Sequence, residues 1–415
     1  MQDIKMIENK LPKDWKVVEL KEVVSILGDG LHGTPKYSSE SEYYFINGNN
    51  LVNGKIKIKD NTKKVSVDEF EKYKKPLNDS TVLVSINGTL GNQAFYNNEK
   101  VILGKSACYF NVLDCLNKKY VSLVLSGQDF LNYAHKNATG STIPNVSLKS
   151  MREYKFPLPP LETQHAIVSK IEQLFSELDQ GIADLKTAQA QLKVYRQSVL
   201  KHAFDGKLTN KNLKEGKLPE GWEIVEISQL AKIETGTTPS KNNPDFYGNE
   251  YPFYKPTDLE AGNNVFLSKD GLTELGLKHA RYVPEFSTLV TCIGATIGKT
   301  GFIKAGGGFN QQINAIVPNK DINPLFIYYQ AICLNFQKQI IDNASATTLP
   351  IINKSKFQIL KMVICDLNEQ HQIVQEIESR LSVADKMEES IQESLQKAEA
   401  LRQSILKKAF SGDLV

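Results

Sequence analysis

The part of the chain closest to a known catalytic motif is the glycine-rich stretch Gly294-Ala-Thr-Ile-Gly298-Lys299-Thr300. A phosphate-binding loop has four residues between its first glycine and the Gly-Lys pair, so that backbone N–H groups surround the phosphates. This stretch has three residues there, and the related stretch Gly88–Asn92 contains no lysine. We therefore interpret Gly294–Thr300 as a structural turn and not as a nucleotide site.

Other combinations of reactive residues each lack an essential partner. Asn243–Phe246 reads N-P-D-F, close to the N-P-P-[YF] loop of adenine methyltransferases, but no glycine-rich cofactor loop precedes it. The Pro244-Asp245 pair is not followed by the acidic-x-Lys element of a nuclease centre. The six histidines do not cluster at the spacing of metal ligands, and the five cysteines form no C-x-x-C pair. The sequence therefore predicts a chain that is not an enzyme and that has no metal site and no disulfide framework.

Polar loops rich in glycine are better candidates for a functional site, because their side chains can form hydrogen bonds with nucleic acid. Asn, Gln, Lys, Ser and Thr reach base edges and phosphates, and small residues let the backbone approach a duplex. For any single residue an ordinary turn is the simpler interpretation, but the clustering in both halves of the chain favours a DNA-binding surface. Lys299 and the amides of its turn are candidate phosphate contacts.

The candidate DNA-binding residues of the first half are His32, Thr34, Lys36, Asn47, Asn49, Asn87, Thr89, Gln93, Lys105, Ser141 and Thr142. Those of the second half are Thr237, Thr238, Ser240, Lys241, Lys255, Thr296, Lys299, Asn310, Gln311, Thr347 and Thr348.

An internal repeat indicates which elements must position these loops. Residues 11–19 read LPKDWKVVE and residues 218–226 read LPEGWEIVE, so the two tryptophans of the chain fall at the same point in each copy. Residues 161–209 match residues 367–415 without a gap, with 18 identities in 49 positions. A period of about 206 residues is too long for a solenoid. It predicts a duplicated domain with its connector.

Between the matched blocks the two copies diverge but keep some landmarks in register. The aligned landmarks are Ile86, Thr89 and Gly91 with Ile293, Thr296 and Gly298, and Asn137, Ala138, Thr142 and Pro144 with Asn343, Ala344, Thr348 and Pro350. Two related domains with different surfaces would bind two different segments of a ligand.

Each connector, 161–209 and 367–415, is predicted to be a long helix. Neither contains proline, and Gly206 and Gly412 follow at the places where glycine ends a helix. Apolar residues recur at coiled-coil spacing over about four heptads. In the first helix the two rows are Ile171, Leu178, Leu185, Leu192 and Val199, with Leu174, Gly181, Ala188 and Tyr195. In the second helix they are Ile377, Ala384, Ile391, Ala398 and Ile405, with Met387 and Leu401.

The small residues Gly181, Ala188, Ala384 and Ala398 are expected to let the helices approach closely. His165 and His371 lie beside Gln164 and Gln370, where capping or packing explains them better than catalysis. The residues expected to pair the helices or to contact partner proteins are Gln164, His165, Ile171, Leu178, Leu185, Leu192, Arg196, Phe204, Gln370, His371, Ile377, Ile391, Leu401, Arg402 and Phe410.

The segments between the connectors read as mixed, strand-rich domains. Short runs rich in β-branched and aromatic residues recur in both copies, followed by short helical segments at about 119–132 and 325–340. The expected strands are 80–86, 101–104, 108–113, 287–293, 301–304 and 313–318.

Composition and charge permit DNA binding without establishing it. The net charge is +3 in 415 residues, but residues 1–160 carry +5, residues 210–366 carry +1, and the two connectors carry 0 and −3. A duplex-binding face needs local positive potential, which the first segment supplies. No apolar run approaches the length of a membrane span, and the N-terminus lacks a signal pattern, so we expect a cytoplasmic protein.

Taken together, these motifs resemble the specificity (S) subunit of type I restriction–modification systems. The resemblance is carried by the LPxxW pairs at 11–15 and 218–222, the Q-H-x-I-V blocks at 164–168 and 370–374, and the RQS-x-L-K-x-A-F endings at 196–204 and 402–410. It covers nearly the whole chain. It implies an α+β chain with two target-recognition domains, 1–160 and 210–366, separated by two antiparallel coiled-coil spacer helices, 161–209 and 367–415.

The resemblance also implies the partners. Each domain is expected to read one half of a split target in double-stranded DNA, through the major groove. The chain is expected to dock two modification (methyltransferase) subunits and the restriction subunits, which would carry S-adenosylmethionine, ATP and Mg²⁺, while this chain binds no cofactor. The weak positive charge of the second domain departs from this pattern. Two alternatives remain open at this point: a protein-interaction scaffold that never touches DNA, and a degenerate methyltransferase.

Overall fold

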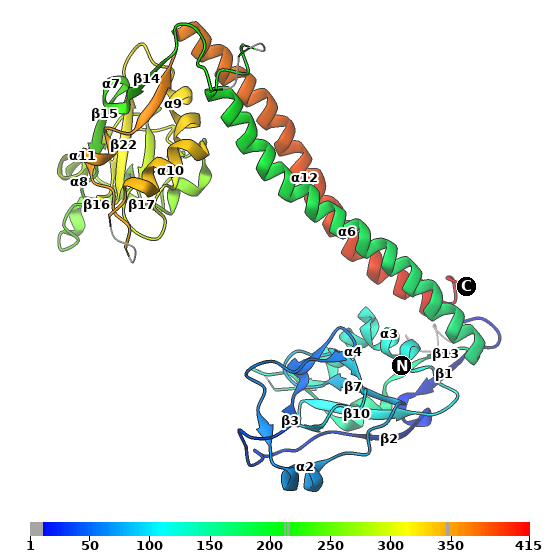
Figure 1. Cartoon of the computed structure of the whole chain (residues 1–415). Coiled ribbons are helices and arrows are strands. Elements are labelled where there is room, and N and C mark those ends of the chain that lie inside the picture. The colour runs from blue at the N-terminus through cyan, green and yellow to red at the C-terminus, as the bar shows by residue number, and fades with distance from the viewer. Residues whose placement is uncertain (1–10, 141, 211–212, 214–215, 346–348) are drawn as a thin grey trace. The chain divides into compact units, whose positions relative to one another are not determined.

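The chain forms two compact units in a computed structural model that describes residues 11–415 except 141, 211–212, 214–215 and 346–348 (Figure 1). Unit 1 comprises Met1–Leu185 and Glu393–Val415, and unit 2 comprises Lys186–Gln392. Each unit contains one strand-rich domain and part of each of two long helices. No helix in the described ranges is long and apolar enough to cross a membrane.

The domain of unit 1 is built around an antiparallel four-stranded sheet with the order β2-β10-β7-β8. Its strands are β2 (Val24–Gly28), β7 (Thr81–Ser85), β8 (Gln93–Phe95) and β10 (Ala107–Val112). Every residue of β7 is buried. Because side chains alternate across a strand, this means that both faces of the sheet are covered.

One face of this sheet packs on helices and the other on a smaller sheet. Val82, Val84 and Phe110 enter a core with the helices, whereas Leu83 and Tyr109 enter a second core. The helices are α3 (Lys118–Ser126), α4 (Gln128–Asn137) and α5 (Leu148–Glu153). The smaller sheet has the order β6-β3-β9, with β6 (Lys64–Val65), β3 (Tyr43–Ile46) and β9 (Val101–Leu103).

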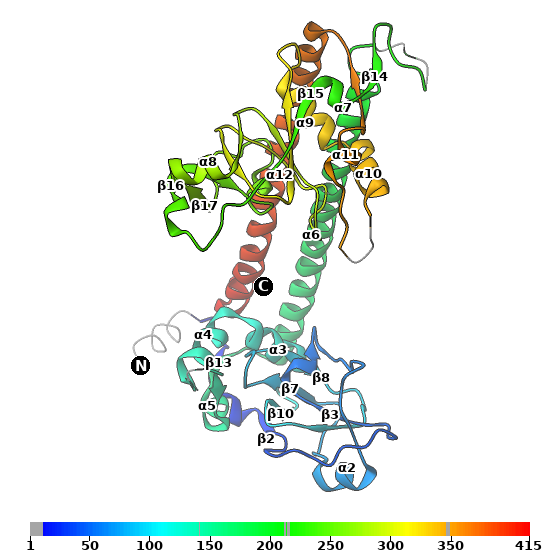
Figure 2. The ribbon, with the colours of Figure 1, turned by 90° about the vertical axis from the view of Figure 1, so that its left-hand side faces the viewer.

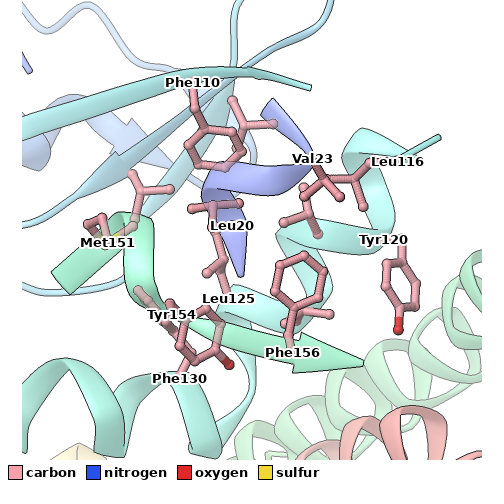
Figure 3. Close-up of a cluster of buried hydrophobic side chains, with 14 of the residues drawn as sticks. Leu20, Val23, Phe110, Leu116, Tyr120, Leu125, Phe130, Met151, Tyr154 and Phe156 are labelled. Atoms are coloured by element: carbon pink, nitrogen blue, oxygen red, sulfur yellow. The ribbon is translucent and has the colours of Figure 1, made fainter. Parts of the chain in front are cut away.

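The remaining elements of this domain are short. β1 (Lys16–Glu19) pairs with β13 (Lys155–Leu158), which brings the start of the domain beside its end. Figure 3 shows the helical core of unit 1, where Phe110, Phe130 and Phe156 converge from a sheet strand, a helix and β13. The other elements are β4 (Leu51–Val52), β5 (Lys55–Ile56), α2 (Val67–Tyr73), β11 (Ala138–Thr139) and β12 (Asn145–Val146).

The domain of unit 2 repeats this plan. Its main sheet has the order β15-β22-β19-β20, and its second sheet the order β17-β16-β21-β18. The main strands are β15 (Ala231–Thr235), β19 (Thr288–Thr291), β20 (Thr300–Phe302) and β22 (Ile313–Pro318). The second sheet contains β16 (Tyr247–Tyr254), β17 (Asp270–Leu272), β18 (Arg281–Val283) and β21 (Gly307–Phe309).

The pairing of the domain's ends is repeated as well. β14 (Glu223–Glu226) pairs with β23 (Lys361–Ile364), as β1 pairs with β13. The helices of this domain are α7 (Ile227–Leu230), α8 (Glu274–His279), α9 (Pro324–Ala331), α10 (Leu334–Asn343) and α11 (Lys354–Phe357). The prediction of two similar mixed domains is confirmed.

The two helical segments expected after the strands each prove to be two helices. In unit 1 the break falls at Gly127, whose extended backbone makes it the N-cap of α4. In unit 2 it falls at Ile332 and Cys333, between α9 and α10. The apolar pattern continues across both breaks, so it did not reveal them.

The two long helices are α6 (Leu161–Phe204) and α12 (Leu367–Ser411). They end before the predicted limits, and Gly206 and Gly412 adopt φ of 76° and 85°, as helix-terminating glycines do. In unit 1 the start of α6 packs against the end of α12, and in unit 2 the end of α6 packs against the start of α12. The helices therefore pair antiparallel within each unit (Figures 1 and 2).

The first of the two heptad rows expected in each helix is correct, and the second is correct only for Leu174 and Ala188, which are half-buried. The first row is buried or half-buried throughout, from Ile171 to Val199 and from Ile377 to Ile405. Met387 and Leu401 are about half exposed instead of buried, at 54% and 50%. Tyr195 is also exposed, and a Cβ on Gly181 would meet nothing within 4 Å, so Gly181 does not bring the helices closer.

The real second row lies four residues after the first. Four residues turn a helix by about 40° past a full turn and three fall about 60° short, so the fourth residue faces the partner more directly. Because this row contains polar residues, hydrophobicity alone did not mark it. Its members are Val168, Phe175, Ile182, Gln189, Arg196 and Ala203 in α6, and Val374, Leu381, Glu388, Leu395, Arg402 and Ala409 in α12.

Candidate nucleic-acid interface

In unit 1 the turn between β9 and β10 gathers three of the candidate loops. The amide of Leu31 donates to the carbonyl of Leu103 at 2.7 Å, which places His32 beside the turn. The amide of Gly104 donates to Ile46 at 2.8 Å, and the amide of Ile86 donates to Ser106 at 3.0 Å. The loops that carry His32, Asn47 and Asn87 therefore meet around Lys105.

These loops line a hollow of about 540 Å³ that includes His32, Asn87, Lys105 and Asn145 beside apolar residues. Asn87 Nδ2 donates to Asn145 Oδ1 at 3.0 Å. Ser106 Oγ donates to Asn47 Oδ1 at 3.0 Å. We call His32, Asn47, Asn87 and Lys105 loop cluster 1, a set of amide, imidazole and ammonium groups of the kind that reads base edges.

Unit 2 builds the same frame with equivalent backbone hydrogen bonds. Thr237 donates to Phe309 at 3.0 Å, Asn310 to Tyr254 at 3.1 Å, and Cys292 to Gln312 at 2.7 Å. The positions of loop cluster 1 are therefore occupied in unit 2 by Thr238, Lys255, Ile293 and Gln311, which we call loop cluster 2.

The hydrogen bonds also correct the alignment of the two copies. Val146 donates to the carbonyl of Ile86 at 2.8 Å, and Ile352 donates to that of Cys292 at 2.9 Å, so Ile86 corresponds to Cys292 and not to Ile293. The turn that follows is one residue longer in unit 2. The sequences did not reveal this insertion because Ile293, one residue after Cys292, is of the same type as Ile86.

The glycine-rich turn Gly294–Thr300 is structural, as predicted. Gly294 and Gly298 adopt φ of 99° and 86°, a region that disfavours other residues. The amides of Gly294, Ile297, Gly298 and Lys299 all donate to carbonyls of the chain, so these four amides are not free to bind a phosphate. Lys299 Nζ lies 2.7 Å from Glu260 Oε1, and this hydrogen bond lowers the pKa of Glu260.

The other sequence candidates divide into exposed, buried and undescribed residues. Gln93 and Asn310 are more than nine-tenths buried, so we leave them out of the proposed surface. Gln93 faces the helices, where its Nε2 donates to Ser126 Oγ of α3 at 3.1 Å, and Asn310 Nδ2 donates to Gln312 Oε1 at 3.0 Å. Lys255 is held by Asp270 at 2.5 Å. The exposed candidates are Thr34, Lys36, Asn49, Thr89, Thr142, Thr237, Ser240, Lys241 and Thr296. Ser141, Thr347 and Thr348 lie outside the described residues.

A group of lysines beside loop cluster 1 was missed at the level of sequence. Lys59 Nζ donates to the carbonyl of Asn49 at 3.1 Å, and Lys63 lies 5.9 Å from the centre of the exposed Tyr37 ring. Lys64 lies 5.7 Å from the Tyr44 ring. None of these three lysines forms an ion pair with a described residue. The signal was available in the alternating run K-I-K-I-K-D-N-T-K-K at 55–64.

The repeated glutamines of the long helices serve inside the chain. Gln164 Oε1 accepts from the amide of Asn117 at 2.8 Å, and Gln370 Oε1 accepts from that of Asn323 at 2.9 Å. Both glutamines are buried. His371 Nδ1 lies 2.9 Å from Asn323 Nδ2, whereas His165 is exposed. These side chains join the start of each long helix to the domain before it.

The phenylalanines at the helix ends join each long helix to a domain. Phe204 packs edge-on against Phe326, with ring centres 5.5 Å apart. Phe410 packs in the same way against Tyr120, at 5.6 Å. The end of α6 is thus anchored in the domain of unit 2, and the end of α12 in the domain of unit 1.

Among the described residues no group of three or more His, Cys, Asp or Glu side chains is placed to hold a metal ion. The geometry offers two hydrogen-bonding surfaces of similar frame and different side chains. An interface of this kind can recognise a polar ligand by shape and by donor and acceptor pattern.

Comparisons with known proteins agree with this picture over most of the chain. Residues 12–186 and 219–397 each match the family described as the type I restriction modification DNA specificity domain. The chain is 25% identical over 351 residues to the EcoBI specificity subunit of Escherichia coli, covering 80% of this chain and 73% of that protein. It is 23% identical over 435 residues to the EcoDI specificity subunit of the same species, covering 99% and 90%.

Two solved structures share the fold. One, from a study of complex assembly and conformational transition of the type I R-M system, gives a TM-score of 0.75 at 18% identity, covering 97% of this chain and 99% of that one. The HsdS subunit from Thermoanaerobacter tengcongensis gives a TM-score of 0.61 at 18% identity, covering 97% and 98%. Both support two mixed domains in tandem with paired long helices.

Proposed function

The chain belongs to the type I restriction modification DNA specificity family, and on this premise we propose that each of its two domains reads one half of a two-part DNA target. The reading surfaces are loop cluster 1 in unit 1 and loop cluster 2 in unit 2, with the exposed loop residues around them. Recognition of this type needs donors and acceptors fixed on a stable frame, because each base pair is distinguished by their pattern in the major groove.

The observation that carries the proposal is the combination of one frame with two sets of side chains. His32 and Lys105 of unit 1 are replaced by Thr238 and Gln311 in unit 2, although the backbone hydrogen bonds around them are equivalent. In unit 2 the side chains of Thr238 and Gln311 are hydrogen-bonded to each other. A duplicated reader whose contact residues have diverged is suited to two different half-sites.

The charges favour stronger contact of unit 1 than of unit 2 with the phosphates of the DNA backbone. Lys59, Lys63 and Lys64 are adjacent to loop cluster 1 and form no ion pair with a described residue, so their charges are available to phosphates. In unit 2, Lys255 and Lys299 are already paired with Asp270 and Glu260. We expect unit 2 to depend more on base contacts than on phosphate contacts.

Catalysis belongs to other subunits in this proposal. The chain would dock two methyltransferase subunits, which would bind S-adenosylmethionine, and restriction subunits, which would use ATP and Mg²⁺. The long helices α6 and α12 run from one unit into the other and would serve both as spacer and as docking surface. A non-catalytic reader of this kind determines where its partners act.

The direct test is to map methylated sites in the genome of a host that expresses the chain with its partner subunits. We expect one motif of two specified segments separated by an unspecified gap. Methylation at a single continuous motif, or methylation that is independent of this chain, would contradict the proposal. The isolated chain should neither methylate nor cleave DNA.

A further inference from the structure

Unit 2 has an apolar groove that is separate from loop cluster 2. The groove lies between the last turns of α6, the start of α10 and the β14-β23 ribbon, and has a volume of about 870 Å³. Its lining includes Val194, Phe204, Ile224, Leu334 and Met362. Gln197 Oε1 accepts from the amide of Leu334 at 3.2 Å, which holds α10 to α6 across the groove.

Three apolar side chains of the groove face solvent to an unusual extent. Val194 is 67% exposed, Ile224 60% and Leu334 64%. Single exposed apolar residues are ordinary, but several around one hollow are typical of a surface that a partner covers. The groove is thus a candidate docking site, and its occupant must offer apolar side chains.

The rim of the groove carries an excess of positive charge. Lys193, Lys201 and Lys338 border it, and none forms an ion pair with a described residue. Lys361 also lies on the rim but is paired with Glu226 at 3.1 Å. Asp205 is the carboxylate among the lining residues. A complementary occupant therefore has carboxylates beside its apolar side chains.

The equivalent flank of unit 1 has a different character. α4 corresponds to α10 residue by residue, and Gln128 and Asn132 stand where unit 2 has Leu334 and Lys338. Gln128 Nε2 donates to Asn132 Oδ1 at 2.9 Å, so these two polar side chains bind each other. On the helix, Glu399 and Ala400 replace Lys193 and Val194. The flank of unit 1 is therefore less apolar and less positive.

We propose that the groove of unit 2 docks an apolar segment flanked by carboxylates on one methyltransferase subunit, and that it binds this subunit before a second one attaches at unit 1. The inference rests on the proposed function, because it takes the methyltransferase as the partner. The two flanks share a backbone plan but differ in apolar surface and charge, so two identical subunits bind them with unequal affinity. Assembly is then ordered, with unit 2 occupied first.

The test uses the full-length chain and the methyltransferase subunit of its own system, mixed over a range of concentrations and followed by sedimentation velocity. We expect two steps of unequal affinity for the wild-type chain. The double variant Val194→Ala, Leu334→Gln gives unit 2 the side chains of unit 1 at the two apolar positions that differ. Its tighter step should weaken at least tenfold, which corresponds to about 1.4 kcal/mol.

The chain offers a matched control in Gln128→Leu, which changes the equivalent exposed position of unit 1 and should leave the tighter step unchanged. A second variant, Lys338→Glu, should weaken the tighter step and reduce its dependence on salt. Melting curves identical to wild type show that the variants fold.

The outcomes separate the inference from the function on which it rests. If the wild-type chain binds two subunits with equal affinity, or if the double variant binds as the wild type does, the inference is wrong and the proposed function stands. If the wild-type chain binds no methyltransferase subunit, both are wrong.

Discussion

Arg196 of α6 and Arg402 of α12 occupy equivalent positions 206 residues apart, and each reaches across to an equivalent aspartate on the other helix. Arg196 Nη1 lies 2.6 Å from Asp385 Oδ1, and Arg402 is paired with Asp179. Both arginine side chains are about three-quarters buried, at 24% and 25% exposed. A polar residue in a heptad row favours the one register in which it is satisfied.

The two arginines differ in the additional residue that each contacts. Arg196 Nη2 also lies 2.9 Å from Glu388, whereas the guanidinium of Arg402 stacks on Phe175 at 4.5 Å from the ring centre. The pairs are reciprocal, with the arginine on α6 in one and on α12 in the other, so a single antiparallel register satisfies both. The arginines therefore identify the register of the helices more specifically than the apolar rows do.

The first prediction concerns this register. Arg196→Glu removes two ion pairs worth about 0.5–1 kcal/mol each and places like charges together, so we expect a melting temperature lower by several degrees. The triple variant Arg196→Glu, Asp385→Arg, Glu388→Arg restores opposite charges and should recover most of the stability. Failure of the triple variant to recover would show that the pair does not hold the helices in register.

The second prediction concerns the buried glutamines. Gln370→Ala leaves the amide of Asn323 and the carbonyl of Cys365 without their partner, and each unsatisfied buried group costs about 1–3 kcal/mol. Hydrogen exchange should therefore increase at the start of α9 and of α12, while the domain of unit 1 stays protected. The exposed His165→Ala serves as the control. Equal protection in Gln370→Ala and wild type would contradict the structural role.

The third prediction concerns the lysines beside loop cluster 1. Changing Lys59, Lys63 and Lys64 together to Gln should reduce the slope of log affinity against log salt by up to about 0.9 for each phosphate that is no longer neutralised. Lys299→Gln should change the slope less, because Lys299 is already paired with Glu260. The measurement is DNA binding by the assembled complex over a salt series. A larger slope change in Lys299→Gln would place the phosphate contacts elsewhere.

Much of this architecture was predictable because duplication repeats its signals. The helix ends are marked by Gly206 and Gly412, and the buried strands β7 and β19 by their β-branched runs. Two local features were not recognised in the sequence. A one-residue insertion in unit 2 made Ile293, and not Cys292, look equivalent to Ile86. Arg196 and Arg402 were expected to pair the helices, but the heptad row that contains them was missed because apolar residues were sought.

The loops of the candidate site and most residues of the two clusters were named from the sequence, but which of them meet was not. His32, Asn47, Asn87 and Lys105 meet only because backbone hydrogen bonds from Gly104, Leu31 and Ile86 gather their loops. No short-range pattern encodes such contacts. Burial of Gln93 and Asn310 likewise follows from tertiary packing, since Gln93 faces α3 and Asn310 lies in the turn after β21.

The fourth prediction concerns the spacer. Inserting seven residues after Leu185 and seven after Gln392 lengthens each helix by about 10 Å and keeps the apolar rows nearly aligned. At about 3.4 Å per base pair, the gap between half-sites should grow by about three base pairs. Two-residue insertions at the same points turn each face by roughly 200° and should prevent assembly. An unchanged gap in an active seven-residue variant would show that other parts set the spacing.

If each domain reads its own half of the target, exchange of one side chain between the loop clusters should change one half at a time. Lys105→Gln gives unit 1 the residue of unit 2, and Gln311→Lys makes the reverse change. Methylated sites are mapped for both variants in the same host. Removal of one base contact costs about 1–3 kcal/mol of discrimination. We expect Lys105→Gln to relax or alter one half of the motif only, and Gln311→Lys to affect the other half only. Changes in both halves from either single variant would contradict the proposal that each domain reads its own half.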